Sequence, residues 1–465
     1  MMPVMRIVKI VLVSVLIISP IAGVMVYKNI GHTPGELMDY CERRLQGHPR
    51  LESIMLPVFS GIRTLLREPS LKAINDTPFY VPPLKPSGVL NPVGRPGPTS
   101  NETTANGRII KVGKFQPIKT IEAAAKIAVD GDIVQIESGD YHGDVAVWRQ
   151  KKLTLRGING NARLYADGES AEAKAIWVIR DGDFDIENIE FIGARVYDNN
   201  GAGIRFEKGN LRVRNCLFYA NENGILAGSE NSNIQIENSE FAYNGAGNGL
   251  SHNLYIGAVQ SLTITGSYFH HANIGHLFKS RARKNFIAYN RFTDQEGGRA
   301  SYELDFPNGG IVEMRGNIVQ QNRRTENSTL INYGEEGYRW EDNKLYIINN
   351  TLVNDQPYGG AFLRVAAGAE FVISTNNLLV GPGRYHINDA LIANNDMTVE
   401  KTAFIDADNY DYQLNFLGKE LALLPEDKTL AVNHEPILAN QYVYPRGVVK
   451  LAGETRYAGA LQPLQ

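Results

Sequence analysis

After residue 180 the chain repeats one pattern of apolar and polar positions. Runs such as FDIENIEF, LRVRNCLF and LTITGSYF alternate apolar and polar residues, then place a small or polar pair before another large apolar residue. Alternation with a period of two indicates β-strands, and repetition at intervals of 23 to 33 residues indicates a solenoid. The recurring large apolar position falls at Phe191, Phe218, Phe241, Phe269, Phe292, Val319, Leu352 and Leu378.

The polar pair before this position predicts a stacked column inside the solenoid. Its second member is asparagine in four successive repeats, at Asn290, Asn317, Asn350 and Asn376, and Cys216 holds the same place earlier in the chain. Asparagines stacked at the strand separation of about 4.8 Å can hydrogen-bond along the column. We expect these residues, and Cys216 with them, to have a structural role.

Each repeat contains a second short strand. Examples are GIRF at residue 203, NLYI at 253, FKS at 278 and TLIN at 329. Short strands that recur with long connections are expected to pair in parallel, with one face buried.

The N-terminus carries a targeting signal. Residues 7–27 are apolar apart from one lysine, and a helix of that length can just span a bilayer. Arg6 and Lys9 place the N-terminus in the cytoplasm by the positive-inside rule, so the rest of the chain is expected on the periplasmic side of the inner membrane. A cleaved signal peptide, giving a secreted protein, is the alternative.

Composition divides the chain into five segments. Residues 29–78 show helical spacing that is broken near Gly47–Pro49, which predicts two short helices in a stalk or cap. A segment rich in proline and glycine follows as a linker. The predicted segments are 1–28 (membrane anchor or uncleaved signal), 29–78 (stalk or cap), 79–107 (linker), 108–395 (β-helix) and 396–465 (closing segment).

The two ends of the main domain resemble a known family. The opening KTIEAAAKIAVDGDIVQIESGDYHG and the closing NYDYQLNFLGKELALL and ETRYAGALQ resemble those of pectate-lyase-like and chondroitinase-like polysaccharide lyases. The resemblance covers residues 108–465, about three quarters of the chain. It implies an all-β, right-handed parallel β-helix that begins with a short capping helix. Because this fold carries several chemistries, the resemblance is more specific for fold than for activity.

Bulk composition narrows the functional classes. The net charge of −3 gives no general attraction to nucleic acid, so no nucleic-acid partner is expected. Cys41 and Cys216 are the chain's two cysteines and lie far apart in the sequence, which argues against a disulfide framework. Any anion binding must therefore come from a local cluster of side chains.

Residues 248–310 are the candidate for such a cluster, because they are unusually rich in polar side chains. If Leu254, Phe278 and Tyr302 point inward, the residues between them face outward in columns. One predicted column is Tyr255–Lys279–Glu303, and the other is Gly257–Arg281–Asp305–Asn332.

This assortment fits elimination at a uronic acid. The proton next to a carboxylate is weakly acidic, so the carboxylate must be neutralised and a base must be within reach. Lys279 is the candidate base, if Arg281 and Arg283 lower its pKa. Arg281 can clamp the carboxylate through its planar guanidinium. The candidate proton donors to the leaving oxygen are His252, Tyr255 and His276.

The resemblance adds an expectation for the same residues. β-Helix lyases often place a lysine and an arginine on the concave strand face, and some hold a calcium ion with asparagine and acidic side chains. That implies a role for Asn253, Glu303 and Asp305, although a complete family calcium motif is not present and metal dependence stays open. Asn332 and Arg283 complete the expected ligand-binding set.

Several interpretations of the cluster remain open. The charged residues could form only the structural ion pairs Glu303–Lys279 and Asp305–Arg281. The first functional hypothesis is a lyase, or the related C5-epimerase, acting on an anionic polysaccharide. The second is a β-helix glycoside hydrolase, which needs two carboxyl groups flanking the scissile bond. The third is a non-catalytic polysaccharide-binding module for export or attachment, for which Tyr255 and Tyr302 are a short aromatic row.

Overall fold

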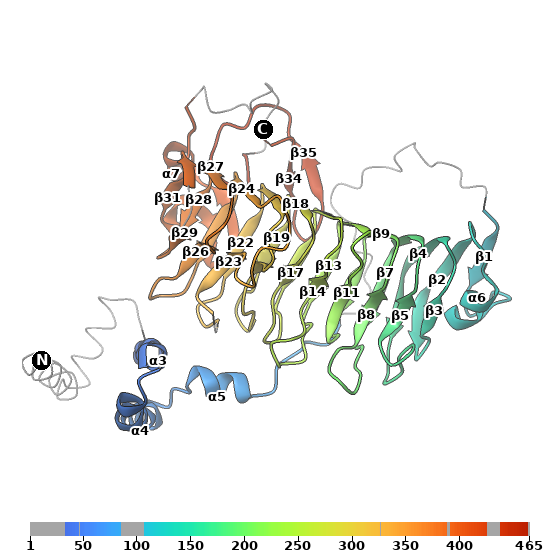
Figure 1. The fold of residues 1–465 in the computed structure, drawn as a ribbon, viewed down its shortest axis with the longest axis horizontal. Helices are drawn as coiled ribbons and strands as arrows, with labels where there is room; N and C mark the ends of the chain where they lie inside the picture. Colours follow the sequence, from blue (N-terminus) through green and yellow to red (C-terminus); the bar gives the residue numbers. More distant parts are fainter. Residues whose placement is uncertain are drawn as a thin grey trace, which may run out of the picture. The chain divides into compact units, whose positions relative to one another are not determined.

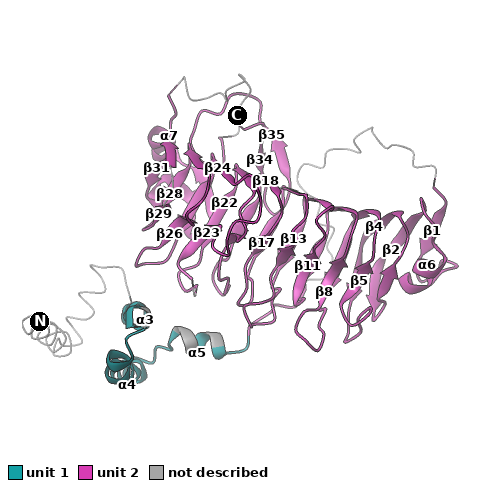
Figure 2. Cartoon of the chain, viewed as in Figure 1, with its two compact units in different colours: residues 1–78 teal, residues 79–465 magenta. Residues whose placement is uncertain are grey.

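The chain divides into two compact units, residues 1–78 and residues 79–465 (Figure 2). The predicted membrane-spanning segment at 7–27 and most of the predicted linker lie outside the described residues. None of the described helices is long and apolar enough to cross a membrane. The computed structural model describes residues 33–45, 47–84, 107–325, 327–387, 391–425 and 438–463.

The first unit contains three short helices, α3 (Pro34–Leu45), α4 (Pro49–Leu66) and α5 (Leu71–Asp76). The break between α3 and α4 falls where the helical spacing is interrupted, as predicted. Arg63 of α4 joins the two helices through a buried ion pair, with its Nη2 2.7 Å from Oδ1 of Asp39.

The second unit is a parallel β-helix of about ten turns (Figure 1). Its first side is a ten-stranded sheet in which every neighbouring pair is parallel. The strands of this sheet are β3 (Ala146–Trp148), β5 (Ala175–Ile179), β8 (Ala202–Phe206), β11 (Asn223–Ala227), β14 (Leu254–Ile256), β17 (Phe278–Ser280), β20 (Leu304–Phe306), β23 (Thr329–Tyr333), β26 (Ala361–Val365) and β29 (Arg384–Ile387).

A second sheet, of 21 strands, forms the other sides of the coil in two parallel rows. The repeated run of the sequence bends at its polar pair, so that each run contributes one strand to each row. One row contains β1 (Ile109–Val112), β2 (Ile133–His142), β4 (Lys152–Tyr165), β6 (Asp183–Glu187), β9 (Asn210–Arg214), β12 (Asn233–Glu237), β15 (Ser261–Thr265), β18 (Lys284–Ala288), β21 (Ile311–Arg315), β24 (Lys344–Ile348), β27 (Phe371–Thr375) and β30 (Leu391–Asn394). The other contains β7 (Ile189–Ile192), β10 (Leu217–Tyr219), β13 (Glu240–Ala242), β16 (Tyr268–His270), β19 (Arg291–Thr293), β22 (Ile318–Gln321), β25 (Thr351–Asn354), β28 (Leu378–Val380) and β31 (Met397–Val399).

The interior is filled by the recurring apolar position. Phe191, Phe218, Phe241, Phe269 and Phe292 are fully buried and stack with ring centroids 4.6 to 5.0 Å apart. Burying one such side chain contributes about 1.5–3 kcal/mol. The parallel strand pairing and this stack confirm the predicted parallel β-helix, and its right-handed sense stays an expectation from the resemblance.

The predicted asparagine column is present, but its last member is Asn377 and not Asn376. Asn290 donates to Asn317 (3.1 Å), Asn317 to Asn350 (2.9 Å), and Asn350 to Asn377 (3.1 Å). The predicted member Asn376 instead takes the left-handed corner conformation, with φ of 56°. The predicted alignment paired Leu352 with Leu378, but the strands pair Leu352 with Leu379. The predicted column residue was therefore one position too early in the sequence.

Cys216 belongs to the same column, as predicted. The N–H of Cys216 donates to Oγ of Ser239 (3.2 Å), the N–H of Ser239 to Oγ of Ser267 (3.1 Å), and the N–H of Ser267 to Oδ1 of Asn290 (2.9 Å). The column thus supplies acceptors for backbone N–H groups at a corner that the strand ladders do not cover.

Both ends of the β-helix are closed. Helix α6 (Ile121–Ile127) buries Ile121 and Ala124 against the first turns (Figure 1). The other end is followed by η1 (Lys401–Ala403), β32 (Phe404–Asp406), η2 (Ala407–Asn409), β33 (Asp411–Leu414) and α7 (Phe416–Leu421). The last described segment, with β34 (Asn440–Tyr442) and β35 (Val448–Lys450), runs back along the coil, where the N–H of Gly447 donates to the carbonyl of Gly266 (2.8 Å).

Candidate functional site

The candidate site lies on the outward side of the ten-stranded sheet, where polar residues share one column. Tyr255 of β14 aligns with Lys279 of β17, Lys279 with Asp305 of β20, and Asp305 with Asn332 of β23. Side chains alternate along a strand, so the buried neighbours of these residues point inward and the column points outward. The structure therefore brings four of the predicted residues into one row.

The predicted alignment of Lys279 with Glu303 is wrong. Phe278 aligns with Leu304, two residues later than the predicted partner Tyr302. The inward positions of β20 are Leu304 and Phe306, and the ring of Phe306 lies 5.3 Å from that of Phe278. This apolar stack fixes the register and places Asp305, rather than Glu303, beside Lys279.

Asp305 is the buried anion of the site. Its Oδ2 lies 3.0 Å from Nζ of Lys279 and 3.4 Å from Nε2 of His276, and its Oδ1 accepts from Nδ2 of Asn332 (2.8 Å). Burial raises the pKa of Asp305, although Lys279 and Asn332 act in the opposite direction. The predicted ion pair of Asp305 with Arg281 is absent, because Arg281 takes a different partner.

Arg281 is held in a fixed orientation by three neighbours. Its Nε donates to the hydroxyl oxygen of Tyr255 (3.0 Å), and its Nη1 donates to Oδ1 of Asn308. Its Nη2 lies 2.7 Å from Oε2 of Glu336, whose Oε1 lies 3.0 Å from Nζ of Lys279. A single carboxylate, that of Glu336, therefore bridges the two cations.

Lys279 is protonated in this arrangement. Burial alone would lower the pKa of Lys279, but the carboxylates of Asp305 and Glu336 outweigh it and raise the pKa above its ordinary value. The hypothesis that Arg281 and Arg283 lower this pKa is wrong for the structure described. Arg283 instead faces Asp342, with Nη2 3.7 Å from Oδ2.

The two histidines form a stacked pair beside Lys279. The rings of His252 and His276 are 4.5 Å apart, and Nδ1 of His252 accepts the N–H of His276 (3.0 Å). Nδ1 of His276 accepts the N–H of Tyr302 (3.4 Å), so we assign the proton of each neutral ring to Nε2. Burial, followed by Lys279 and Arg281, lowers the pKa of His252 to about 3, and burial also lowers the pKa of His276. Both rings are therefore neutral donors at pH 7.

The predicted calcium ligands do not converge. Asn253 is fully buried at a corner of the coil, where its Oδ1 accepts from Asn244 (2.8 Å) and its Nδ2 donates to the carbonyl of His270 (2.9 Å). Glu303 is fully buried and forms no ion pair or hydrogen bond with Lys279 or Asp305 within the residues that the structure describes, so only Asp305 of the three contacts Lys279. In the described part of the chain, no group of three or more histidine, cysteine or acidic residues is placed to hold a metal ion. The structure therefore does not bring Asn253 and Glu303 together with Asp305.

Glu303 and Asp294 are two fully buried acids close enough to interact electrostatically. Neither carboxyl oxygen of Glu303, nor Oδ1 of Asp294, has a hydrogen-bond partner among the described residues. Burial raises the pKa of both groups well above the ordinary range, and the charge of Asp294 raises that of Glu303 further. A proton on Glu303 removes the cost of a buried charge.

Because the pKa of Glu303 is raised by burial, we expect the free energy of unfolding to depend on pH. The folded protein retains a proton on Glu303 that the unfolded chain releases near pH 4.5, so stability falls as the pH rises above that value. Glu303→Gln, which mimics the protonated acid, is expected to flatten this fall and to raise stability at pH 8, by about 1.4 kcal/mol for each unit of pKa shift. Melting temperatures measured from pH 5 to pH 8 test this, and parallel curves for the two proteins would contradict it.

Sequence reasoning missed the residues that complete the site. Glu336 and Trp340 come from the loop after β23, and the indole Nε1 of Trp340 donates to the carbonyl of Arg281 (3.2 Å). Asn308 belongs to the PNGG turn that follows β20. The available signal was the YGEEG run at residues 333–337, whose two adjacent acids follow a strand of the site-bearing sheet.

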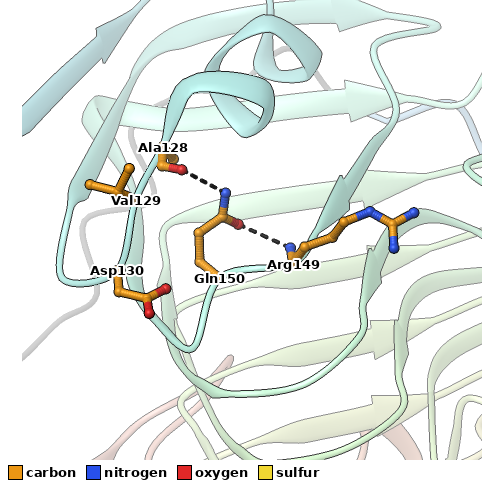
Figure 3. A pocket seen from close by; sticks show the side chains of 5 residues that line it. All are labelled: Ala128, Val129, Asp130, Arg149 and Gln150. Atoms are coloured by element: carbon orange, nitrogen blue, oxygen red, sulfur yellow. Dashed lines mark hydrogen bonds between the residues drawn. The ribbon is translucent and has the colours of Figure 1, made fainter.

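Surface hollows are present away from the candidate site. One of about 490 Å³ is lined by Ala128, Val129, Asp130, Arg149 and Gln150 near α6 (Figure 3). There Nε2 of Gln150 donates to the carbonyls of Ala125 and Ala128, which satisfies the end of the helix. The contacts of Gln150 with the end of the helix account for this hollow.

Comparisons with known proteins show similarity in fold to two solved structures. No family model and no curated protein matches the chain. Among solved structures, pectate lyase Pel9A is similar at 14% identity, with 77% of this chain and 98% of that chain covered and a TM-score of 0.47. ORF18 of Geobacillus virus E2 is similar at 14% identity, with a TM-score of 0.41. The match covers 58% of this chain and 53% of the ORF18 chain. These likenesses assign no activity, and the β-helix fold rests on the strand pairing described above.

Proposed function

We propose that this protein binds an anionic, uronate-containing polysaccharide along the ten-stranded sheet and acts on it as a lyase or a C5-epimerase. The observation that carries the proposal is the pair of cations, Lys279 and Arg281, arranged around one carboxylate on the outward side of the β-helix. The same arrangement would neutralise the carboxylate of a uronate residue, which makes its neighbouring proton more acidic.

The chemistry follows from the positions of the side chains. Lys279, once deprotonated, takes the proton from C5 of the uronate. The electron pair of that C–H bond forms the C4=C5 double bond, and the bond from C4 to the glycosidic oxygen breaks. The leaving oxygen takes a proton from Tyr255, whose hydroxyl oxygen accepts from Arg281 and whose hydrogen is free of that bond. In the epimerase, the C4–O bond stays intact and C5 takes a proton on its opposite face from a donor on that side.

A non-catalytic polysaccharide-binding module is the second candidate, and one observation favours it. The raised pKa of Lys279 keeps the candidate base protonated while Asp305 and Glu336 both contact it. A cation in that state binds carboxylates without removing a proton. A hydrolase is less supported. It would use Glu303 and Asp305 as its two flanking carboxyl groups, and Glu303 is fully buried.

The location of the protein is part of the proposal. Residues 7–27 would anchor it in the cytoplasmic membrane, and the β-helix would then face extracytoplasmic polysaccharide. The membrane and the polysaccharide are thus the two proposed partners. Extraction of the native protein by detergent, but not by high salt, would support the anchor.

The test of activity uses the purified full-length protein and a panel of uronate polymers. A lyase produces unsaturated uronates, which absorb in the ultraviolet, and an epimerase incorporates deuterium at C5 in D2O without that absorbance. New reducing ends without absorbance would indicate a hydrolase. Binding without any of these changes would favour the binding module.

Tyr255→Phe is expected to lower turnover by roughly 10²–10⁴-fold with little change in stability, because it removes the proposed proton donor and keeps the ring beneath Arg281. Tyr302→Phe is the matched control, since Tyr302 contacts the edge of His276 and has no role in the proposed reaction. Initial rates on the best polymer measure the effect. Equal rates in the two variants would remove Tyr255 from the mechanism.

A further inference from the structure

We infer that Glu336 is an internal ligand of the carboxylate subsite, and that a ligand carboxylate must displace it before binding. The inference rests on the proposed function only for the identity of that ligand, a uronate residue. It adds a regulatory contact to the site, in which the protein's own side chain competes with the polysaccharide.

The first argument is the geometry of the contact. The two oxygens of Glu336 are divided between the two cations, with Oε1 3.0 Å from Nζ of Lys279 and Oε2 2.7 Å from Nη2 of Arg281. This is the arrangement that a bound uronate carboxylate would need. Glu336 therefore occupies the position of the ligand group and does not lie beside it.

The second argument is the difference in exposure. The side chain of Glu336 is 47% exposed, whereas that of Lys279 is 12% exposed. Lys279 is also held by Asp305, and Arg281 by Tyr255 and Asn308. Both cations thus stay in place without Glu336, and the glutamate is the component that can leave.

The third argument is that the loop is anchored independently of this side chain. The N–H of Gly334 donates to the carbonyl of Phe306 (3.0 Å), and the N–H of Glu336 to that of Pro307 (3.0 Å). Further along, Trp340 donates to the carbonyl of Arg281 (3.2 Å). Rotation of the Glu336 side chain alone would therefore open the subsite, with the backbone unchanged.

The competition has a predictable strength. The side chain of Glu336 is about half exposed, so solvent screens both of its ion pairs and a ligand carboxylate can displace them. The apparent affinity of a ligand is reduced by the fraction of protein whose subsite is open. Removing the charge of Glu336 should therefore tighten ligand binding roughly three- to tenfold.

Glu335 provides a matched control in the same loop. Its side chain is 46% exposed, similar to that of Glu336, but its Oε1 lies 3.8 Å from Nη1 of Arg364 instead of contacting the subsite. Glu335→Gln changes the net charge by the same amount as Glu336→Gln. A general electrostatic effect would appear in both variants, and displacement from the subsite only in the second.

The first experiment measures binding of a galacturonate trisaccharide, and of the equivalent trisaccharide from each polymer of the panel, to full-length protein by calorimetry. Glu336→Gln is expected to bind the preferred trisaccharide roughly three- to tenfold more tightly than wild type, and Glu335→Gln within twofold of it. Wild-type affinity or weaker binding in Glu336→Gln would overturn the inference while leaving the proposed function intact.

A second experiment separates the inference from the proposed function. Malonate, a small dicarboxylate, is titrated against each variant and the melting temperature is measured, with sodium chloride at matched ionic strength as control. Malonate is expected to stabilise Glu336→Gln more than wild type. If no trisaccharide binds any variant but this difference appears, the internal ligand stands and the polysaccharide assignment fails. If malonate stabilises both proteins equally, the internal ligand is rejected.

Discussion

Lys279→Met is expected to lower turnover by at least about 10³-fold, the largest effect on activity predicted for this protein. The substitution removes the proposed base and one of the two cations that neutralise the uronate carboxylate, and each role contributes about 10²-fold or more. Initial rates by ultraviolet absorbance measure the loss. Rates within tenfold of wild type would exclude Lys279 as the base.

The same substitution leaves Asp305 without its closest cation. Asp305 is 2% exposed, and an unpaired buried charge destabilises by about 3–5 kcal/mol. The double variant Lys279→Met/Asp305→Asn removes both charges and should melt close to wild type while remaining inactive. His271→Ala is the activity control, because His271 contacts His270 at a corner of the coil and should keep wild-type turnover.

Asn317→Ala is expected to destabilise the β-helix by about 3–5 kcal/mol, the largest effect on stability. Asn317 is fully buried, donates to the carbonyl of Ile287 (2.8 Å) and to Asn350 (2.9 Å), and accepts from the N–H (3.0 Å) and Nδ2 (3.1 Å) of Asn290. Each buried polar group left without a partner costs about 1–3 kcal/mol. Hydrogen exchange should quicken first in β18, β21 and β24, because turns of a solenoid depend on their neighbours.

Asn317→Ser is the matched control for this column. Ser267 occupies an equivalent position, where its Oγ accepts a backbone N–H (3.1 Å). A serine at 317 can therefore keep one acceptor, and roughly half of the destabilisation is expected. An alanine variant within about 0.5 kcal/mol of wild type would show that the column is not a stabilising element.

The fold could be predicted because its determinants are local and repeated. Period-two alternation marked the strands, and the recurring phenylalanines are the interior stack that the structure contains. The asparagines from Asn290 to Asn350 were placed correctly for the same reason. The one-residue error at Asn376 arose in the last repeat, where the apolar pair Leu378–Leu379 allowed two alignments and only strand pairing decided between them.

The site could be predicted only in part, because its geometry depends on connections between strands. Tyr255, Lys279 and Asp305 share a column, but a register based on equal spacing paired Lys279 with Glu303. The segment between β19 and β20 is longer than that register assumed. The actual alignment was decided by the inward stacking of Phe306 on Phe278, which a spacing argument does not contain.

Glu336 could not be placed beside Lys279 from the sequence, although the YGEEG run marked its loop. It is 57 residues from Lys279 along the chain and reaches it from a loop two turns of the coil away. Loop conformation depends on contacts such as that of Trp340 with the carbonyl of Arg281, for which the sequence pattern gives no signal. The position of Glu336 also explains why the pKa of Lys279 is raised and not lowered as expected. The carboxylates of Glu336 and Asp305, rather than two guanidinium groups, act on the amine.

The central claim is that Lys279 and Arg281 form a subsite for the carboxylate of a polysaccharide. An experimental structure of Glu336→Gln protein with the preferred uronate trisaccharide tests it most directly. The account predicts a sugar carboxylate between Nζ of Lys279 and the guanidinium of Arg281, with the sugar chain running across β14, β17 and β20. A trisaccharide bound on another side of the coil, or with its carboxylates turned away from both cations, would contradict it.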